Sequence, residues 1–391
     1  MKPAKVALFF AHPTVPEYNK LLTMPFVFNI LRLLDKEGID VDLYLSEKNT
    51  ECYWDYLSEN VQLKELNYYE ANLLPHRVRH KMMVKGWNSK VSVRSLPSYD
   101  LVFGCGPVGT IFAERLSRTQ KTPFVYVNDE FPDAYQFSYL KSLEKIAIKN
   151  ATLIIAPDES RIEPIQKQVE GIEDIPACVL PNAPLQSSAA NLPEVDWHQR
   201  LNIPAGKKMF LYVGNVLDMN QAPEIFSSLP TWPEEAVLVV KVKSLDPRMT
   251  REYGHLIFED KVFFTSDFLS EEEMNSLFKY SMGSFGLYRD ISDNFKFIGK
   301  SSGKIMSSLI CGAPVIGSRA SSLDFVEEHK LGVLVDHPVD IPKAIRTLLA
   351  KQDELRTNCQ STVDQWSYEH YWSLFCEKLS QVSDLELDSG D

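Results

Sequence analysis

The sequence predicts an α/β protein with two domains, each built around a mostly parallel sheet. Short apolar runs alternate with amphipathic stretches along the chain, which is typical of strand–helix–strand units. The alternation restarts after a polar, alanine-rich segment, Gln186–Pro193, which we expect to be a linker. The chain has 391 residues, a length that suits two domains or so.

The first domain opens with the apolar run Lys5–Phe10, which we expect to be a buried parallel strand. Apolar residues then recur at helical spacing over Met24–Glu37, Gly38 ends this helix, and Val41–Leu45 forms the next strand. This order favours parallel pairing. Further strands are predicted at 61–66, 99–104, 123–127, 151–156 and 178–180, and further helices at 110–119, 134–149 and 160–169.

The second domain begins with the strand Lys208–Val213, which ends in Gly214 and Asn215. The strand Ala236–Val242 delivers two cations, Lys241 and Lys243, to its carboxyl end. Ser270 and Glu273 form a capping-box pattern ahead of a helix at 270–280. Further strands are predicted at 262–265, 283–287, 315–316 and 333–335, and further helices at 223–229, 304–311, 341–351 and 363–382.

Composition excludes several classes of protein. A net charge of −12 argues against general nucleic-acid binding, which relies on neutralising phosphates. No apolar run approaches the roughly 18–20 residues that a membrane span needs, and the first apolar run is more typical of a strand than of a signal peptide. The six cysteines are scattered without a C-x-x-C pair, which indicates reduced thiols and not a disulfide framework or a zinc site. We therefore expect a cytoplasmic protein.

One segment, Pro75–Arg94, is strongly basic in this acidic chain and contains no acidic residue. Apolar residues are interleaved with its cations, so the segment could lie on an anionic membrane surface or bind an anionic acceptor. The alternative is a solvated helix whose apolar side packs inward. The candidate contact residues are Arg77, Arg79, Lys81 and Lys85.

Two acidic residues, Asp129 and Glu130, directly follow the predicted strand 123–127. Ligands of α/β proteins bind at the carboxyl ends of parallel strands. Both residues are therefore candidates for acid/base work or for binding a substrate hydroxyl. The alternative is a helix N-cap with solvated carboxylates.

The stretch Asn294–Val315 predicts a phosphate site. A polar loop with Ser301, Ser302 and Gly303 precedes a helix over Lys304–Cys311. The first amides of a helix have no partner within the helix, and together with the helix dipole they favour anions. Lys300 and Lys304 add positive charge. The alternative is a capped core helix, because the glycine spacing of a Walker loop or a dinucleotide fingerprint is absent.

Taken together, these features resemble the GT-B glycosyltransferases, and most closely the large retaining family 4. The resemblance is clearer in the second half of the chain. It is carried by Val179–Pro184, Phe210–Asn215, Lys261–Tyr288, Lys300–Ser318 and Trp366–Phe375.

The resemblance implies two Rossmann-like domains and a C-terminal helix that crosses back to the first. Residues 1–184 would form an acceptor-binding domain and residues 185–362 a nucleotide-sugar-binding domain. The helix would span residues 363–383, followed by an acidic tail at 384–391.

The implied activity is transfer of a sugar from a nucleotide sugar to a saccharide or lipid-linked acceptor, with retention and without a metal or other cofactor. The pathway would be glycan or cell-surface polysaccharide synthesis, on a cytoplasmic protein loosely held at the membrane. Asp129 or Glu130 would orient the acceptor or the donor sugar, and Arg289 would offset charge on the leaving group. The donor site would comprise Gly214, Asn215, Lys241, Lys243, Lys300, Ser301, Ser302, Gly303 and Lys304.

The sequence departs from the family pattern at four positions. Asn215 and Asn220 stand where the family often has Arg and Lys, and Gly299 and Ser307 stand where it has two glutamates. These departures put the diphosphate clamp and ribose recognition in doubt. They keep two alternatives open: a non-catalytic GT-B-like partner subunit, and a nucleotide-sugar epimerase on the same architecture.

Overall fold

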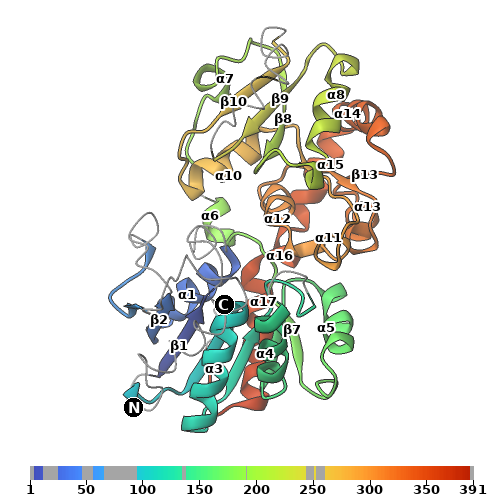
Figure 1. Cartoon of the computed structure of the whole chain (residues 1–391). Helices are drawn as coiled ribbons and strands as arrows, with labels where there is room; N and C mark the ends of the chain where they lie inside the picture. The colour runs from blue at the N-terminus through green and yellow to red at the C-terminus, as the bar shows by residue number, and fades with distance from the viewer. Residues whose placement is uncertain are drawn as a thin grey trace. The chain divides into compact units, whose positions relative to one another are not determined.

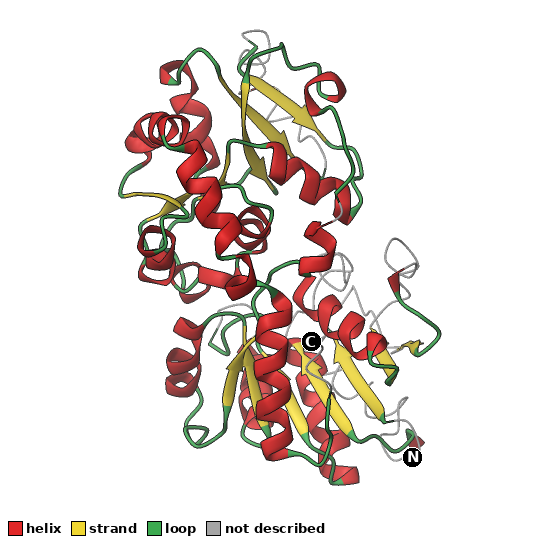
Figure 2. Cartoon of the chain, turned by 180° about the vertical axis from the view of Figure 1, so that it is seen from behind, coloured by secondary structure: helices red, strands yellow, loops and turns green. Residues whose placement is uncertain are grey.

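A computed structural model describes residues 4–11, 25–45, 56–65, 95–133, 138–190, 192–243, 251 and 260–387. The chain divides into two compact units. Unit 1 comprises residues 1–181 and 371–391, and unit 2 comprises residues 182–370. Each unit has its own parallel sheet with helices packed on it (Figures 1 and 2).

Unit 1 contains a seven-stranded sheet in the order β3-β2-β1-β4-β5-β6-β7, and every described pair is parallel. The order reverses between β1 and β4. The strands are β1 Lys5–Phe10, β2 Asp40–Leu45, β3 Val61–Glu65, β4 Leu101–Cys105, β5 Phe124–Val127, β6 Leu153–Ala156 and β7 Ala177–Val179. The helices are α1 Pro25–Lys36, α3 Gly106–Gln120, α4 Ser138–Ile148, α5 Ile162–Gln168 and α17 Tyr368–Val382.

Unit 2 contains a six-stranded parallel sheet in the order β10-β9-β8-β11-β12-β13, which reverses between β8 and β11. The strands are β8 Lys208–Val213, β9 Ala236–Lys241, β10 Val262–Thr265, β11 Gly283–Gly286, β12 Val315–Ser318 and β13 Gly332–Val335. The helices are α6 Gln186–Ala190, α7 Trp197–Arg200, α8 Ala222–Ser228, α10 Glu271–Tyr280, α11 Asp293–Lys296, α12 Gly303–Ile310, α13 Asp324–Glu328, α14 Ile341–Ala350, α15 Gln352–Ser361 and α16 Val363–Trp366.

The strands are buried on both faces, as expected for parallel sheets covered by helices. All five residues from Val6 to Phe10 are inaccessible to solvent, and so are Val237 to Val240 of β9. This explains why the strands appear in the sequence as continuous apolar runs. The predicted fold class, two parallel α/β domains, is confirmed.

The terminal helix α17 packs on unit 1, as the fold prediction required. The indole nitrogen of Trp372 donates a hydrogen bond to Glu37 Oε1 at 3.2 Å. The ring centroid of Phe375 lies 6.0 Å from that of Phe103 on β4. Lys378 Nζ donates to the carbonyl of Ala177 on β7 at 2.8 Å.

Two local predictions were wrong. Residues 363–382 form two helices, because Ser367 adopts an extended backbone (φ −66°, ψ 151°) and its hydroxyl accepts a hydrogen bond from the amide of His370 at 3.2 Å. The segment predicted as a linker contains α6, which packs on α10. There Asn275 Nδ2 donates to the carbonyl of Ser188, which is 7% exposed. A short polar sequence can thus be fixed by partners far along the chain.

The predicted capping box at α10 is confirmed, since Ser270 and Glu273 bond each other's backbone amide groups. We expect Ser270→Ala to lower the free energy of unfolding of unit 2 by about 1 kcal/mol. Ser227→Ala is the matched control, because this exposed serine lies inside α8 and, among the described residues, its hydroxyl bonds only the carbonyl of Pro223. Urea unfolding should separate the two variants, and equal stability would contradict the capping argument.

Candidate functional site

Lys304 lies where the strand order of unit 2 reverses. Its ammonium nitrogen is 4.5 Å from the ring centroid of Tyr288, two residues after the end of β11, and 5.4 Å from the ring centroid of Tyr212 on β8. Ligands of open α/β sheets bind in the crevice at the carboxyl ends of the strands at such a reversal. The fold therefore places this cation at the standard ligand position.

The charge of Lys304 is not neutralised within the described part of the chain. No carboxylate of those residues forms an ion pair with it, and the ammonium faces two aromatic rings. Burial lowers the pKa of Lys304 to about 7. A desolvated cation without a counter-ion is a strong attractor for an anion.

The N-terminus of α12 lies beside this cation. Ser302 is its N-cap: the hydroxyl accepts a hydrogen bond from the amide of Ile305 at 3.4 Å. The same hydroxyl is 2.6 Å from the phenol oxygen of Tyr288. Burial raises the pKa of Tyr288. The predicted serine N-cap of this helix is confirmed as Ser302, and the neutral phenol of Tyr288 holds its hydroxyl in place.

The turn after β8 directly follows the strand that carries Tyr212, one of the two rings that the ammonium of Lys304 faces. Gly214 has φ 110°, and a side chain built on it would meet no atom of the described structure within 4 Å. The phenol of Tyr212 donates to the carbonyl of Asn215 at 2.7 Å, and Asn220 Nδ2 donates to the same carbonyl at 3.4 Å. The side chains of Tyr212 and Asn220 thus hold the turn through the backbone of Asn215, whose own side chain is exposed.

Arg289 has carboxylate partners within its own unit. Its guanidinium forms ion pairs with Asp218, at 3.1 Å, and with Glu224. Its Nε also donates to the carbonyl of Asp218 at 3.0 Å. These contacts tie the loop after β11 to the loop after β8. The proposed role of Arg289 toward a leaving group stays a prediction.

Lys300 and Ser301 face the interior of unit 2. Lys300 is 7% exposed, and its ammonium lies 5.5 Å and 5.3 Å from the ring centroids of Phe325 and Trp366. The hydroxyl of Ser301 donates to the carbonyl of Ile298. The structure therefore places Ser302, Gly303 and Lys304 at the start of α12, where Lys304 faces Tyr288, but it places Lys300 among aromatic side chains of unit 2.

Lys241 is the last residue of β9 and Lys243 follows that strand, next to β8 in the sheet. Lys241 Nζ donates to the carbonyl of Val242 at 3.1 Å, and burial lowers its pKa, whereas Asp267 opposes that shift. Lys243 is exposed. Their donor-binding role also stays a prediction.

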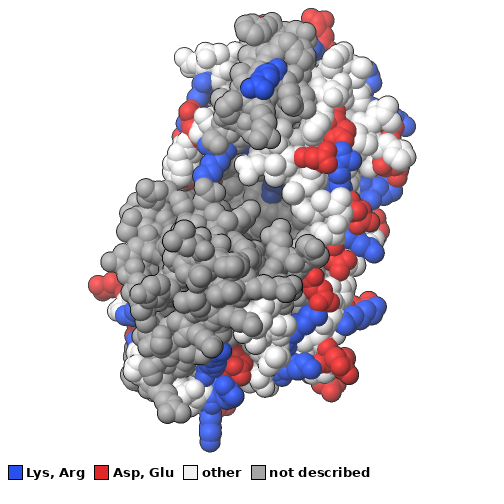
Figure 3. Space-filling model, viewed as in Figure 1, with Lys and Arg blue, Asp and Glu red and all other residues white. Residues whose placement is uncertain are grey.

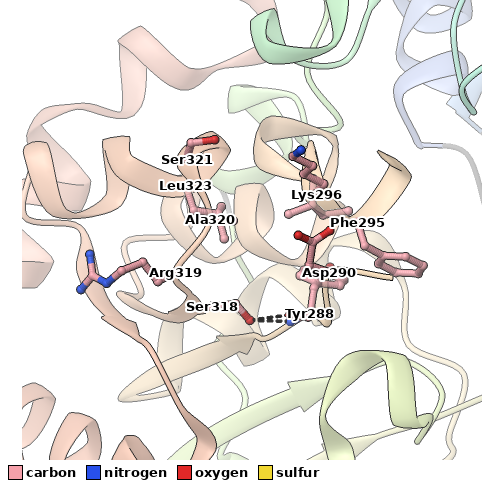
Figure 4. Close-up of a pocket in the computed structure, with 10 residues that line it drawn as sticks. Tyr288, Asp290, Phe295, Lys296, Ser318, Arg319, Ala320, Ser321 and Leu323 are labelled. Atoms are coloured by element: carbon pink, nitrogen blue, oxygen red, sulfur yellow. Dashed lines mark hydrogen bonds between the residues drawn. The ribbon is translucent and has the colours of Figure 1, made fainter. Parts of the chain in front are cut away.

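A pocket of about 250 Å³ opens next to Tyr288, between the loop after β11 and the loop after β12 (Figure 4). Sequence reasoning missed this pocket. Its residues are spread over two loops that show no motif, and the one available signal was Tyr288, the aromatic residue directly after the predicted strand 283–287. The lining residues are Tyr288, Asp290, Phe295, Lys296, Ile298, Ser318, Arg319, Ala320, Ser321 and Leu323.

In unit 1, buried polar groups hold the loop that carries Asp129 and Glu130 after β5. Arg161 Nη1 donates to the carbonyl of Asp129 at 3.1 Å, and Lys141 Nζ is 3.4 Å from the carbonyl of Glu130. The amide side chain of Asn128 also donates to the Glu130 carbonyl, at 2.8 Å. The backbone of the two acids is thus fixed, and both residues are partly exposed.

The two cations of this network are almost fully buried. Arg161 is 3% exposed, and burial lowers its pKa to about 10 although Asp158 and Asp129 oppose that shift. Burial also opposes the charge of Lys141, but Glu144, Asp129 and Glu130 outweigh it and raise the pKa of Lys141. Unit 1 therefore presents a rigid acidic loop at the carboxyl edge of its sheet, where the sequence predicted one.

Arg77, Arg79, Lys81 and Lys85, the predicted acceptor or membrane contacts, lie outside the described residues. On the face in Figure 3, cationic and anionic side chains of described residues are interspersed. Within the described chain, no helix is long and apolar enough to span a bilayer, and no group of His, Cys, Asp and Glu side chains could hold a metal ion.

No family model and no curated protein matches the sequence. Solved structures do match. The chain resembles sucrose-phosphate synthase from Thermosynechococcus elongatus, with a TM-score of 0.69, 15% identity and coverage of 97% of this chain and 98% of that one. It resembles Anabaena HepE in complex with UDP and glucose, with a TM-score of 0.71, 14% identity and coverage of 97% and 100%.

A UDP-N-acetylglucosamine 2-epimerase is also similar, with a TM-score of 0.60, 16% identity and full coverage of both chains. At these identities the likeness establishes the fold and no more. The chain therefore has the GT-B fold, which it shares with sucrose-phosphate synthase and HepE.

Proposed function

We propose that this protein is a glycosyltransferase that takes a sugar from a nucleotide-sugar donor bound by unit 2. The observation that carries the proposal is Lys304, a partly buried cation without a described counter-ion at the strand reversal, beside the N-terminus of α12. A nucleotide diphosphate supplies the missing negative charge. The structural likeness to HepE, whose structures contain UDP and UDP-glucose, supports this donor class.

In the proposed reaction the leaving diphosphate is stabilised by the ammonium of Lys304 and by the free amides at the start of α12. Both are fixed before the reaction, so they stabilise the developing charge without reorganising. Asp129 or Glu130 of unit 1 binds a hydroxyl of the acceptor or of the donor sugar.

We further propose retention at the anomeric carbon, no bound metal or other cofactor, and a role in glycan or cell-surface polysaccharide synthesis. The acceptor is a saccharide or a lipid-linked glycan, and the basic segment with Arg77 and Lys85 holds the protein at an anionic membrane.

Calorimetry with a panel of nucleoside diphosphates and nucleotide sugars tests the donor site. We expect the nucleotides that carry one particular base to bind clearly more tightly than those with other bases. Transfer to saccharide acceptors, followed by NMR of the product's anomeric configuration, then tests the reaction. Binding of no nucleotide at millimolar concentration would overturn the proposal and leave a GT-B-like partner protein.

A second candidate is a nucleotide-sugar epimerase, because two UDP-N-acetylglucosamine 2-epimerase structures are also similar, with TM-scores of 0.61 and 0.60. Incubation with UDP-N-acetylglucosamine and no acceptor separates the two activities. Appearance of the C2 epimer would favour the epimerase, whereas an unchanged sugar that is transferred once an acceptor is added would favour the transferase.

The affinity for a nucleotide sugar should fall as the pH rises. The pKa of Lys304 in the unoccupied site is about 7, and a bound diphosphate raises it, so binding takes up a proton above that pH. The affinity should therefore be highest below pH 7 and decrease by up to tenfold per pH unit above it. Both phosphates of UDP-glucose are esterified and keep their charge between about pH 6 and 9, so this ligand reports the lysine alone.

Calorimetry of UDP-glucose binding across this pH range measures the effect. Lys304→Arg is the control, because its guanidinium stays charged throughout. A pH profile that is flat for the wild-type protein, or equally steep for Lys304→Arg, would contradict the assignment.

A further inference from the structure

The pocket beside Tyr288 contains polar groups that the proposed diphosphate site does not use. Asp290, Lys296 and Ser321 line it, and no side-chain hydrogen bond or ion pair engages them within the described residues. The remaining lining includes Phe295, Ile298 and Leu323. The pocket thus combines an apolar wall with an acceptor, a cationic donor and a hydroxyl (Figure 4).

This combination does not suit a second anion. Arg319, the other cation of the lining, is already neutralised: its guanidinium contacts Glu327 at 2.8 Å and 2.9 Å, and Asp336 at 2.8 Å. Its side chain extends away from Asp290 in Figure 4. The carboxylate of Asp290 would repel an anion. A ring that carries several hydroxyl groups suits the pocket better, because each hydroxyl both donates and accepts, and its C–H faces pack on apolar walls.

The pocket and the phosphate site share a wall. Tyr288 lines the pocket, and the centroid of its ring lies 4.5 Å from the ammonium of Lys304. The hydroxyl of Ser322 accepts from the amide of Gly299 at 3.3 Å and donates to the carbonyl of Lys296 at 3.1 Å, which joins the pocket to the turn before α12. A group covalently attached to a diphosphate at Lys304 is therefore within reach of the pocket.

We infer that this pocket holds the glycosyl group of the nucleotide sugar and that Asp290 selects it by accepting hydrogen bonds from sugar hydroxyls. The inference rests on the proposed donor site at Lys304. The volume of about 250 Å³ suits one sugar ring, since pockets for drug-sized ligands reach roughly 300–1,000 Å³.

The test compares two ligands that differ only in the sugar. Calorimetry should be run with UDP and UDP-glucose, and with GDP and GDP-mannose, on the wild-type protein, Asp290→Asn and Asp290→Ala. We expect both variants to bind the nucleotide sugar about tenfold more weakly while the affinity for the matching diphosphate stays within about twofold. Asp353→Asn, an exposed acid on α15, is the matched control and should change neither affinity.

The outcomes separate the two proposals. A wild-type protein that binds no nucleotide of the full panel at millimolar concentration overturns the proposed function, and the inference with it. The inference alone is overturned if the wild-type protein binds a diphosphate but the Asp290 variants do not discriminate between the two ligands. In that case the variants lower the affinities for the nucleotide sugar and for the diphosphate equally, or change neither. Unchanged melting temperatures of the variants confirm that any loss of affinity is local.

Discussion

Replacing Lys304 with methionine should weaken binding of the preferred nucleoside diphosphate by about 10- to 100-fold. Hydrogen bonds to charged groups contribute about 1.5–3 kcal/mol, and each 1.4 kcal/mol is a tenfold change in affinity. Methionine keeps the length and the apolar stem of lysine, so it can still pack against Tyr212 and Tyr288 and loses only the charge. Calorimetry with the nucleotide found in the ligand panel measures the effect.

The same variant should be at least as stable as the wild-type protein. Burial disfavours the charge of Lys304, as its pKa of about 7 indicates, and methionine removes that cost. A lost affinity with a retained melting temperature therefore cannot be attributed to misfolding. The matched control is Lys343→Met, because this lysine is exposed on α14. An unchanged dissociation constant in Lys304→Met would place the anion site elsewhere.

The second large effect concerns the stability of unit 1. Glu144→Gln should lower the free energy of unfolding by about 3 kcal/mol or more, because it leaves the buried cation of Lys141 without its partner. Glu144 is inaccessible to solvent, Lys141 is 2% exposed, and their charged atoms are 3.0 Å apart. The remaining acids near Lys141, Asp129 and Glu130, are partly exposed and compensate incompletely.

Native-state hydrogen exchange of the β5 and β6 amides measures this loss where it occurs, since a chain of two units need not unfold in one step. Glu163→Gln is the control, because its ion pair with Lys167 is exposed and should contribute little. The double variant Lys141→Met with Glu144→Leu should recover most of the stability, because it removes both charges together. A double variant less stable than Glu144→Gln would contradict the uncompensated-charge explanation.

These two sites differ in how far the sequence could predict them. The helix of Lys304 was predictable from a cap, an apolar run and a glycine stop, all within 20 residues, because local backbone chemistry decides where a helix begins and ends. The acids after β5 were predictable for a similar reason: a strand that is apolar throughout must end where charged residues begin. The buried cations under them were not, because Lys141 and Arg161 approach that loop only after α4 and α5 have packed on the sheet.

The sequence by itself determined the strands, most helices and the two-domain parallel α/β class, because hydrophobic periodicity and helix caps are local. It could not decide which of its many cations is desolvated and unpaired. Lys300 and Lys304 are four residues apart in one motif, yet the first lies among core aromatics and the second at the strand reversal. The pocket of Asp290 depends on two loops brought together by the pairing of β11 with β12. Burial, counter-ions and cavities are properties of contacts between distant residues, so only the tertiary structure decided them.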